Sequence, residues 1–90
     1  MKIEIHSKIF FDYADFEPVL RGWKASGEVI SFTNGCFDLI HHGHVDSLIK
    51  SAEYGTRLIV GLNSDASVSL LKGKGRPLLD GRARAKILAA

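Results

Sequence analysis

Two short apolar runs, each ending in a polar turn, constrain the fold of this chain more than any other feature. The runs are residues 28–33 and 57–62. Between them, four apolar residues recur at the spacing of one helix face: Val45, Leu48, Ile49 and Ala52. A strand, a helix and a second strand in this order form a βαβ unit with parallel strands and a right-handed crossover. The sequence therefore predicts an α/β fold, a parallel sheet with flanking helices.

The first part of the chain predicts an arm and a helix. Residues 1–11 alternate loosely between polar and apolar and fit a short strand or an ordered arm. A helical pattern follows Asp15, a suitable N-cap, and its aromatic residues Phe16 and Trp23 are expected to pack this helix. We therefore divide the chain into an N-terminal arm and helix, 1–26, and an α/β unit, 27–90.

Two more helices are expected after the second run. Capping residues at 63–65 precede a short helical pattern, and Asp80 precedes a last helix over 81–90. Residues 72–77 between them form a basic loop with glycine and proline. Three basic residues of the last helix are expected on its solvent-exposed face: Arg82, Arg84 and Lys86.

Length and charge limit the classes of protein to which this chain can belong. The chain has 90 residues, with 12 Lys and Arg against 10 Asp and Glu, which fits one small globular domain. Positive charge gathers between residues 72 and 86, and such a local patch fits a compact anionic ligand better than a nucleic acid. The apolar runs are too short to span a membrane, and the first residues lack a signal-peptide core. We expect neither nucleic acid nor membrane as a partner.

The chain has a single cysteine, Cys36, which cannot form an internal disulfide. A reducing, cytoplasmic setting is therefore expected. No neighbouring base is placed by a motif to activate the thiol, so we interpret Cys36 as a small packing residue and not as a nucleophile.

The segment from Phe32 to His44 carries the most chemistry. A strand leads through a glycine turn into a helix whose first turn holds His41, Gly43 and His44. The first N–H groups of a helix lack internal partners and lie at the positive end of its dipole, so they favour phosphate. The two histidines are three residues apart and can face one anion, and Gly43 allows close approach to the backbone. In a parallel sheet, ligands bind beyond the carboxyl ends of the strands, where this segment lies.

Other interpretations of these residues stay open. A metal site would need His41, His44 and a carboxylate such as Asp38 or Asp46, but the spacing of the histidines is not the i, i+4 spacing of a metalloprotease helix, and no metal ligand is assigned. A solvated basic loop is the alternative for three residues: Lys72, Lys74 and Arg76.

The same residues carry a family resemblance. The run His41-His42-Gly43-His44 matches the HxGH signature. Longer blocks agree with it: TNGCFD at 33–38, LIVGLNSD at 58–65, LKG at 71–73, RP at 76–77, and Arg84, which aligns with an arginine of the family, together with LAA at 88–90. Over about residues 10–90, the chain resembles the cytidylyltransferase-like nucleotidyltransferase superfamily. Within it, the chain is most similar to the D-glycero-β-D-manno-heptose 1-phosphate adenylyltransferase domain of bacterial ADP-heptose synthase.

The resemblance implies a Rossmann-like (HUP-type) sheet, of which residues 27–90 are the N-terminal part, with further strands and helices expected beyond them. It implies transfer of AMP from ATP, accompanied by Mg²⁺, to heptose 1-phosphate with release of pyrophosphate, in ADP-heptose and lipopolysaccharide precursor synthesis. Two alternatives are a cytidylyltransferase acting on an alcohol phosphate such as glycerol 3-phosphate, and an inactive nucleotide-binding fragment. A homodimer is expected because a partial sheet has bare strand edges, which invite pairing with a second copy. The resemblance also implies completion by another chain or domain and a sugar kinase partner.

The resemblance also implies roles for individual residues. His41, His44 and Lys72 are expected to be catalytic, and Asp38 and Asp65 to bind the substrate. Seven residues are expected to bind the nucleotide or its phosphates: Thr33, Asn34, Gly35, Cys36, Phe37, Gly43 and Arg76. His42 fills the variable position of the signature and receives no role.

Overall fold

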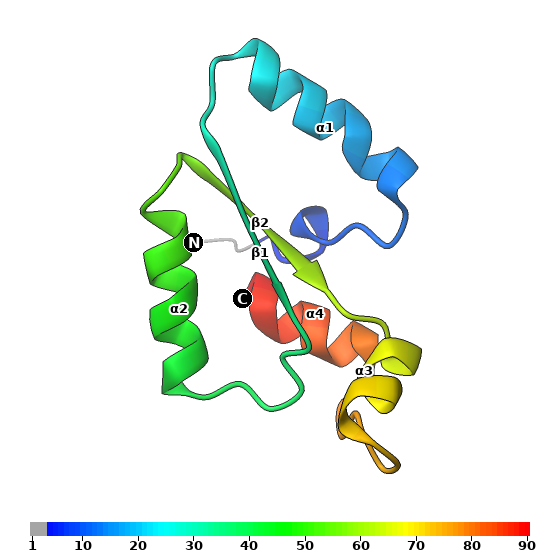
Figure 1. The fold of residues 1–90 in the computed structure, drawn as a ribbon. Coiled ribbons are helices and arrows are strands. Elements are labelled where there is room, and N and C mark those ends of the chain that lie inside the picture. Colours follow the sequence, from blue (N-terminus) through cyan, green and yellow to red (C-terminus); the bar gives the residue numbers. More distant parts are fainter. Residues whose placement is uncertain (1–3) are drawn as a thin grey trace.

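Two parallel strands form the centre of the structure, a computed structural model that describes residues 4–90. Strand β1 spans Ile30–Gly35 and strand β2 spans Arg57–Leu62. Helix α2, His42–Ala52, connects them and lies alongside the strands (Figure 1). The predicted βαβ unit and the α/β class, a partial Rossmann-like sheet with flanking helices, are confirmed.

The first strand is shifted by two residues from its predicted range of 28–33. Asn34 and Gly35 belong to β1 because they pair with Gly61 and Leu62 of β2. Local glycine content predicted a turn there, but the register of the neighbouring strand decides where β1 ends. The second strand has its predicted bounds.

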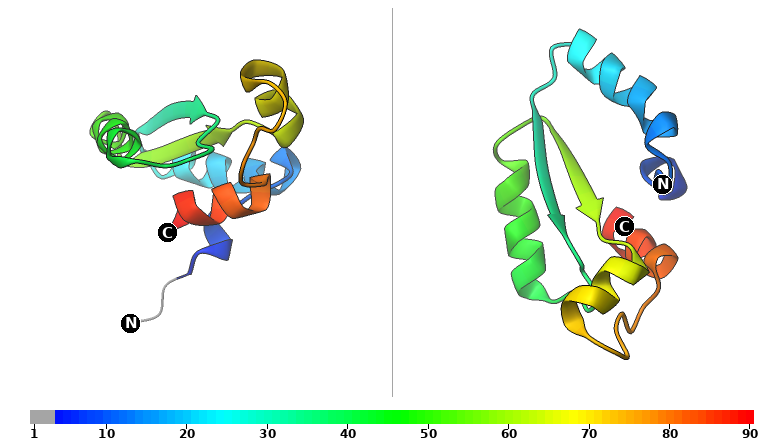
Figure 2. Two further views of the ribbon diagram at one scale, coloured as in Figure 1. Left: turned by 90° about the horizontal axis from the view of Figure 1, so that it is seen from below. Right: turned by 45° about the vertical axis from the view of Figure 1, so that its right-hand side comes forward.

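Two helices follow the sheet. Helix α3 spans Asp65–Lys72 and helix α4 spans Gly81–Ala89. The expected caps are present, since Ser64 Oγ accepts a hydrogen bond from the Ser67 N–H at 3.1 Å and Asp80 Oδ1 accepts one from the Ala83 N–H at 2.8 Å. Helix α3 lies beyond the carboxyl end of β2, and α4 runs back beneath the sheet (Figures 1 and 2).

The N-terminal part differs from prediction in two details. Residues 1–3 lie outside the described part, and His6–Lys8 form a short 3-10 helix, η1, so no strand occurs between residues 4 and 11. Helix α1 spans Tyr13–Ala25. The predicted N-cap Asp15 is wrong, because Asp12 accepts the capping hydrogen bond from the Ala14 N–H at 3.0 Å.

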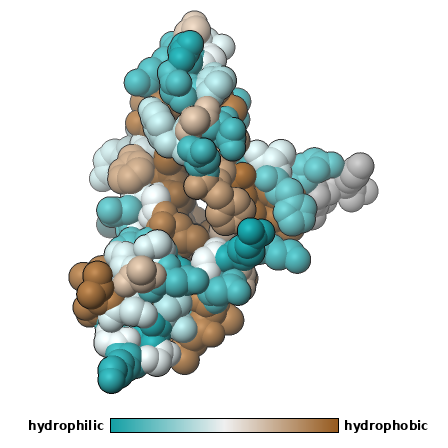
Figure 3. All heavy atoms as spheres, turned by 90° about the vertical axis from the view of Figure 1, so that its right-hand side faces the viewer, coloured by the Kyte–Doolittle hydropathy of each residue, from teal (hydrophilic) through white to brown (hydrophobic). Residues whose placement is uncertain are grey.

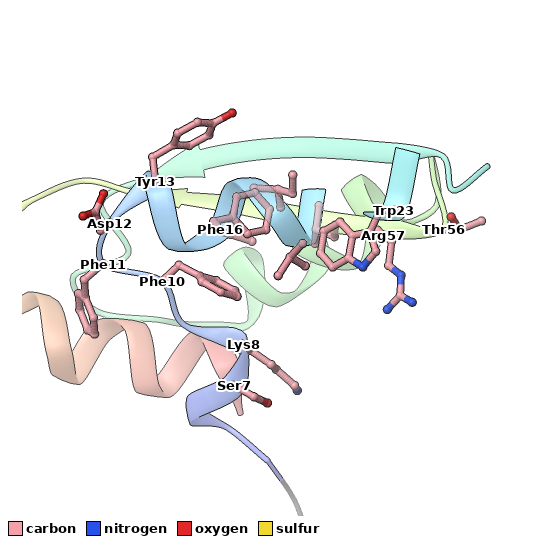
Figure 4. Close-up of a pocket in the computed structure, with 14 residues that line it drawn as sticks. Ser7, Lys8, Phe10, Phe11, Asp12, Tyr13, Phe16, Trp23, Thr56 and Arg57 are labelled. Carbon is pink, nitrogen blue, oxygen red and sulfur yellow. The ribbon is translucent and has the colours of Figure 1, made fainter. Parts of the chain in front are cut away.

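An apolar hollow lies between the arm, α1 and β2 (Figure 3). It has a volume of about 770 Å³. The rings of Phe10 and Phe16 lie 5.0 Å apart, and those of Phe16 and Trp23 lie 5.7 Å apart, so the expected aromatic packing is confirmed (Figure 4). Lys8 Nζ donates to the Ala89 carbonyl at 3.0 Å and ties the arm to the end of α4.

The buried centre is small and partly charged. Val68 and Arg84 are fully buried, and Phe37, Asp38 and Ala89 are nearly so. The expectation that Arg84 lies on the exposed face of the last helix is therefore wrong. Within residues 4–90, no helix combines the length and the apolar content that a membrane crossing requires.

Candidate functional site

A polar cleft of about 390 Å³ lies beyond the carboxyl ends of the strands. All but one of its lining residues are predicted site residues: Cys36, Phe37, Asp38, His41, His44, Lys72 and Arg76, with Leu39 as the addition. They come from the turn after β1, the start of α2, the end of α3 and the following loop. The topology thus brings together residues that are up to 40 positions apart in the chain.

The turn after β1 is shaped by Phe37, which has a positive φ of 48°. A positive φ is costly for a bulky residue and needs support from its surroundings. Here the Phe37 ring is buried and lies 5.5 Å from the His44 ring. A Cβ at Gly35 would come within 2.9 Å of the Phe37 ring, so glycine at position 35 is needed for this packing.

The two histidines cap helix α2 reciprocally. His41 is the N-cap, and its Nδ1 accepts a hydrogen bond from the Gly43 N–H at 3.0 Å. In return, the His41 N–H donates to His44 Nδ1 at 3.2 Å. The two rings lie 4.1 Å apart. This arrangement is a capping box in which imidazole nitrogens replace the usual side-chain oxygens.

The cap fixes which nitrogen carries the proton. A neutral imidazole whose Nδ1 accepts a hydrogen bond has its hydrogen on Nε2. Both His41 and His44 line the cleft and, in the neutral form, therefore carry an Nε2–H donor. The helix amide of Gly43, expected to contact phosphate directly, is already used by His41. A Cβ at Gly43 would lie 2.9 Å from His41 Cε1, so glycine here makes room for the histidine ring.

The surroundings of His44 favour its neutral form. Burial lowers the pKa of His44 below its usual value, and electrostatic interactions with His41 and Lys72 lower it further. Lys72 and Arg76 bring permanent positive charge to the same cleft. The site therefore combines neutral hydrogen-bond donors with cations, a combination suited to phosphate oxygens.

Asp38 holds the basic loop against the cleft. Its side chain is 1% exposed and forms an ion pair with Arg76 Nε. Its Oδ1 also accepts hydrogen bonds from the N–H groups of Leu78 and Leu79 at 2.8 and 3.1 Å. Although burial opposes it, these hydrogen bonds together hold the pKa of Asp38 below its usual range. Binding of a substrate by Asp38 stays a prediction, and the structure adds this anchoring role.

Five predicted residues do not line the cleft: Thr33, Asn34, Gly35, Gly43 and Asp65. The first three lie within β1 and pair with β2. Asp65 begins α3, with its side chain 51% exposed and bonded to Arg84 Nη2 at 2.5 Å. Their proposed contacts with nucleotide or substrate stay predictions.

Sequence reasoning missed two features of the site. Leu39 lines the cleft without any signal in the sequence. Arg84 contacts the turn after β1, and its only sequence signal is its alignment with an arginine of the resembling family. The alternative of a metal site gains no support, since no three His, Cys, Asp or Glu side chains gather as a metal-binding group in residues 4–90.

Comparison with known proteins defines the class. The cytidylyltransferase-like family model matches residues 32–90, more than half of the chain and all of the cleft. The chain therefore belongs to the cytidylyltransferase-like family, as the HxGH signature and the cleft beyond the sheet both indicate.

Individual relatives narrow the class further. The chain is 57% identical over 83 residues to the bifunctional protein HldE of Rhodopseudomonas palustris (strain BisB18). The matched region covers 92% of this chain and 17% of the relative. It is 58% identical over 72 residues to the bifunctional protein HldE of Geobacter metallireducens, covering 80% of this chain and 15% of the relative. The chain thus spans about a sixth of the length of the curated relatives it matches.

Proposed function

We propose that this chain forms the nucleotide-binding part of an adenylyltransferase that transfers AMP from ATP to heptose 1-phosphate. The reaction releases pyrophosphate and serves ADP-heptose and lipopolysaccharide precursor synthesis. One observation carries the proposal: His41, His44, Lys72 and Arg76 converge on one cleft beyond the carboxyl ends of the strands. Similarity to bifunctional HldE proteins supports this branch of the family. Completion of the site by another domain, by a second copy or by a sugar kinase partner is part of the proposal.

The proposed chemistry needs positioning and charge, which this cleft supplies. An oxygen of the sugar phosphate attacks the α-phosphorus of ATP and forms the new O–P bond. The bond from the α-phosphorus to the oxygen that bridges to the β-phosphate breaks, and pyrophosphate leaves with that electron pair. The Nε2–H groups of His41 and His44 donate to phosphate oxygens that gain charge, and Lys72 neutralises the triphosphate. Mg²⁺ enters with ATP as part of the substrate complex.

A second candidate is a cytidylyltransferase acting on an alcohol phosphate such as glycerol 3-phosphate. The description of the matching family, cytidylyltransferase-like, favours keeping it. The proposed contacts all concern phosphates, which ATP and CTP share. An inactive nucleotide-binding fragment is the third possibility, and turnover distinguishes it from both enzymes.

An amide-resolved NMR titration of the chain with Mg·ATP and then with Mg·CTP tests these candidates. We expect backbone amide shifts confined to residues 36–44 and 72–76, with the larger response to Mg·ATP. Lys72→Ala should weaken this binding, whereas the matched control Lys74→Ala, which removes a lysine that does not line the cleft, should not.

Pyrophosphate release with heptose 1-phosphate as the acceptor then separates an enzyme from an inactive fragment. A stronger response to Mg·CTP would move the assignment to the cytidylyltransferases. No response to either nucleotide in a well-dispersed spectrum would contradict the proposed function of this chain.

A further inference from the structure

Arg84 is the most deeply buried charged side chain described, with no exposed surface. Its guanidinium meets four acceptors on three segments of the chain. The Nε–H donates to the Leu79 carbonyl at 3.0 Å, and Nη1 donates to the carbonyls of Cys36 and Asn63 at 2.7 and 2.8 Å. Nη2 donates to Asp65 Oδ1 at 2.5 Å. One side chain from α4 therefore joins the ends of both strands.

The two carbonyls held by Nη1 occupy equivalent places in the sheet. Cys36 and Asn63 each follow the last paired residue of their strand, and the backbone ladder ends with the Asn63 N–H donating to the Gly35 carbonyl at 3.0 Å. Beyond that point, no strand-to-strand hydrogen bond holds the two segments. There, the Arg84 guanidinium bridges the two segments, through its hydrogen bonds to the Cys36 and Asn63 carbonyls.

These two segments become the walls of the cleft. The chain after Cys36 supplies the turn and the two histidines, while the chain after Asn63 continues into α3, which ends at Lys72. A change in the separation of the two carbonyls therefore changes the distance between the histidines and Lys72. Arg84 itself does not line the cleft.

We propose that Arg84 is a positioning residue that fixes the separation of the imidazole wall and the lysine wall of the nucleotide cleft. The inference rests on the proposed function for its ligand but concerns a residue to which that function assigns no contact. A planar fork of donors is required, because one nitrogen must reach two carbonyls while its neighbours hold two further acceptors. A lysine ammonium at the same place offers donors from a single point and cannot reproduce this span.

Arg84→Lys and Arg84→Met test the proposal, with Lys86→Met as the matched control on the exposed side of the same helix. The ¹³C shifts of the Cys36 and Asn63 carbonyls report directly on the bridging contact. We expect both shifts to move in the Arg84 variants and the Kd for Mg·ATP to rise about tenfold. Lys86→Met should leave both carbonyl shifts and the Kd unchanged.

Moved carbonyl shifts with an unchanged Kd would overturn the proposal, because they would show that the bridge does not position the cleft. Unmoved carbonyl shifts would overturn it as well. If both Arg84 variants fail to fold and lose a dispersed spectrum, the proposal is tested on the unsubstituted chain. There the Nε–H signal of buried Arg84 should shift when Mg·ATP binds, although Arg84 does not contact the nucleotide. A signal that does not shift would reject the positioning role. If the unsubstituted chain does not bind ATP, only the proposed function is contradicted. The bridging contact of Arg84 is still tested, because the carbonyl shifts are measured without nucleotide.

Discussion

In His41 and His44, at the start of α2, the two ring nitrogens have different roles. Nδ1 of each accepts a backbone hydrogen bond that forms the helix cap, and Nε2 remains for a ligand. Removing a histidine with alanine would therefore remove a cap and a ligand contact together. Asparagine separates the two roles, because its side-chain oxygen caps helices well but offers no donor at the Nε2 position.

We predict that His41→Asn keeps the chain folded and weakens nucleotide binding. The helix cap is retained by the asparagine oxygen, so the free energy of unfolding should change by less than about 1 kcal/mol. The Kd for Mg·ATP should rise because the Nε2–H contact is lost. Urea unfolding and the NMR titration measure the two effects.

His42→Asn is the matched control, since His42 is exposed and lines no part of the cleft. It should change neither quantity. Equal nucleotide binding by His41→Asn and the unchanged chain would contradict the assigned role of His41.

The sequence motif predicted the shared location of several residues, and their roles stay predictions. His41, His44, Lys72 and Arg76 meet in the cleft because a βαβ unit places the segments after both strands on one side. The sequence could not show that Gly43 makes room for the His41 ring. The orientation of that ring is set by its hydrogen bond to the Gly43 N–H at the helix cap, which no sequence pattern reveals.

Helix α2 is the element whose cap depends on the protonation state of its histidines. An imidazolium has N–H groups at both nitrogens, so it cannot accept the backbone hydrogen bonds at Nδ1. Since folding lowers the pKa of His44, the unfolded chain binds a proton more readily than the folded chain. The stabilisation is thus complete above the ordinary histidine pKa of about 6.5 and decreases as the pH falls below it.

We predict that the free energy of unfolding falls as the pH is lowered from about 6.5 to about 5.5. The loss should amount to about 1.4 kcal/mol for each unit by which folding lowers the pKa. His44→Asn removes the titrating group and should flatten this dependence. Urea unfolding at a series of pH values measures it, and stability that rises toward acid would contradict the role assigned to the cap.

Helices α3 and α4 show why their starts could be predicted from the sequence, whereas the burial of Arg84 could not. Ser64 and Asp80 cap α3 and α4 through contacts within three residues, and such contacts can be read from the local sequence. Arg84 lies in a helix rich in charge, where basic residues normally face water. Three of its four partner groups are backbone carbonyls, which leave no trace in the side-chain pattern.

The whole molecule leaves much apolar surface uncovered. Large hydrophobic residues are exposed on every layer, including Phe32 of β1, Ile49 of α2 and Leu70 of α3. In the part of the chain that the structure describes, the sheet has two strands, so each strand has an unpaired edge. Exposed apolar surface and open strand edges both favour association with a further segment.

We predict that the purified chain associates with itself at micromolar concentration. Sedimentation velocity should show a weight-average mass that increases with protein concentration. Phe32→Ser, which replaces an exposed ring on β1, should reduce this increase, and Lys50→Ser on the exposed side of α2 should not. A mass that stays at 9.9 kDa over the whole concentration range would contradict the prediction.

The buried guanidinium of α4 has a consequence for synthesis. The histidine signature is translated before Arg84, whose guanidinium holds the Cys36 carbonyl from 48 residues further along the chain. Until then, the carbonyls at the strand ends have no permanent partner, and the nascent turn is free to fluctuate. The cleft is therefore completed only after translation has passed Arg84, so a nascent chain stalled before this codon should be more open to proteolysis around the signature than one stalled well beyond it.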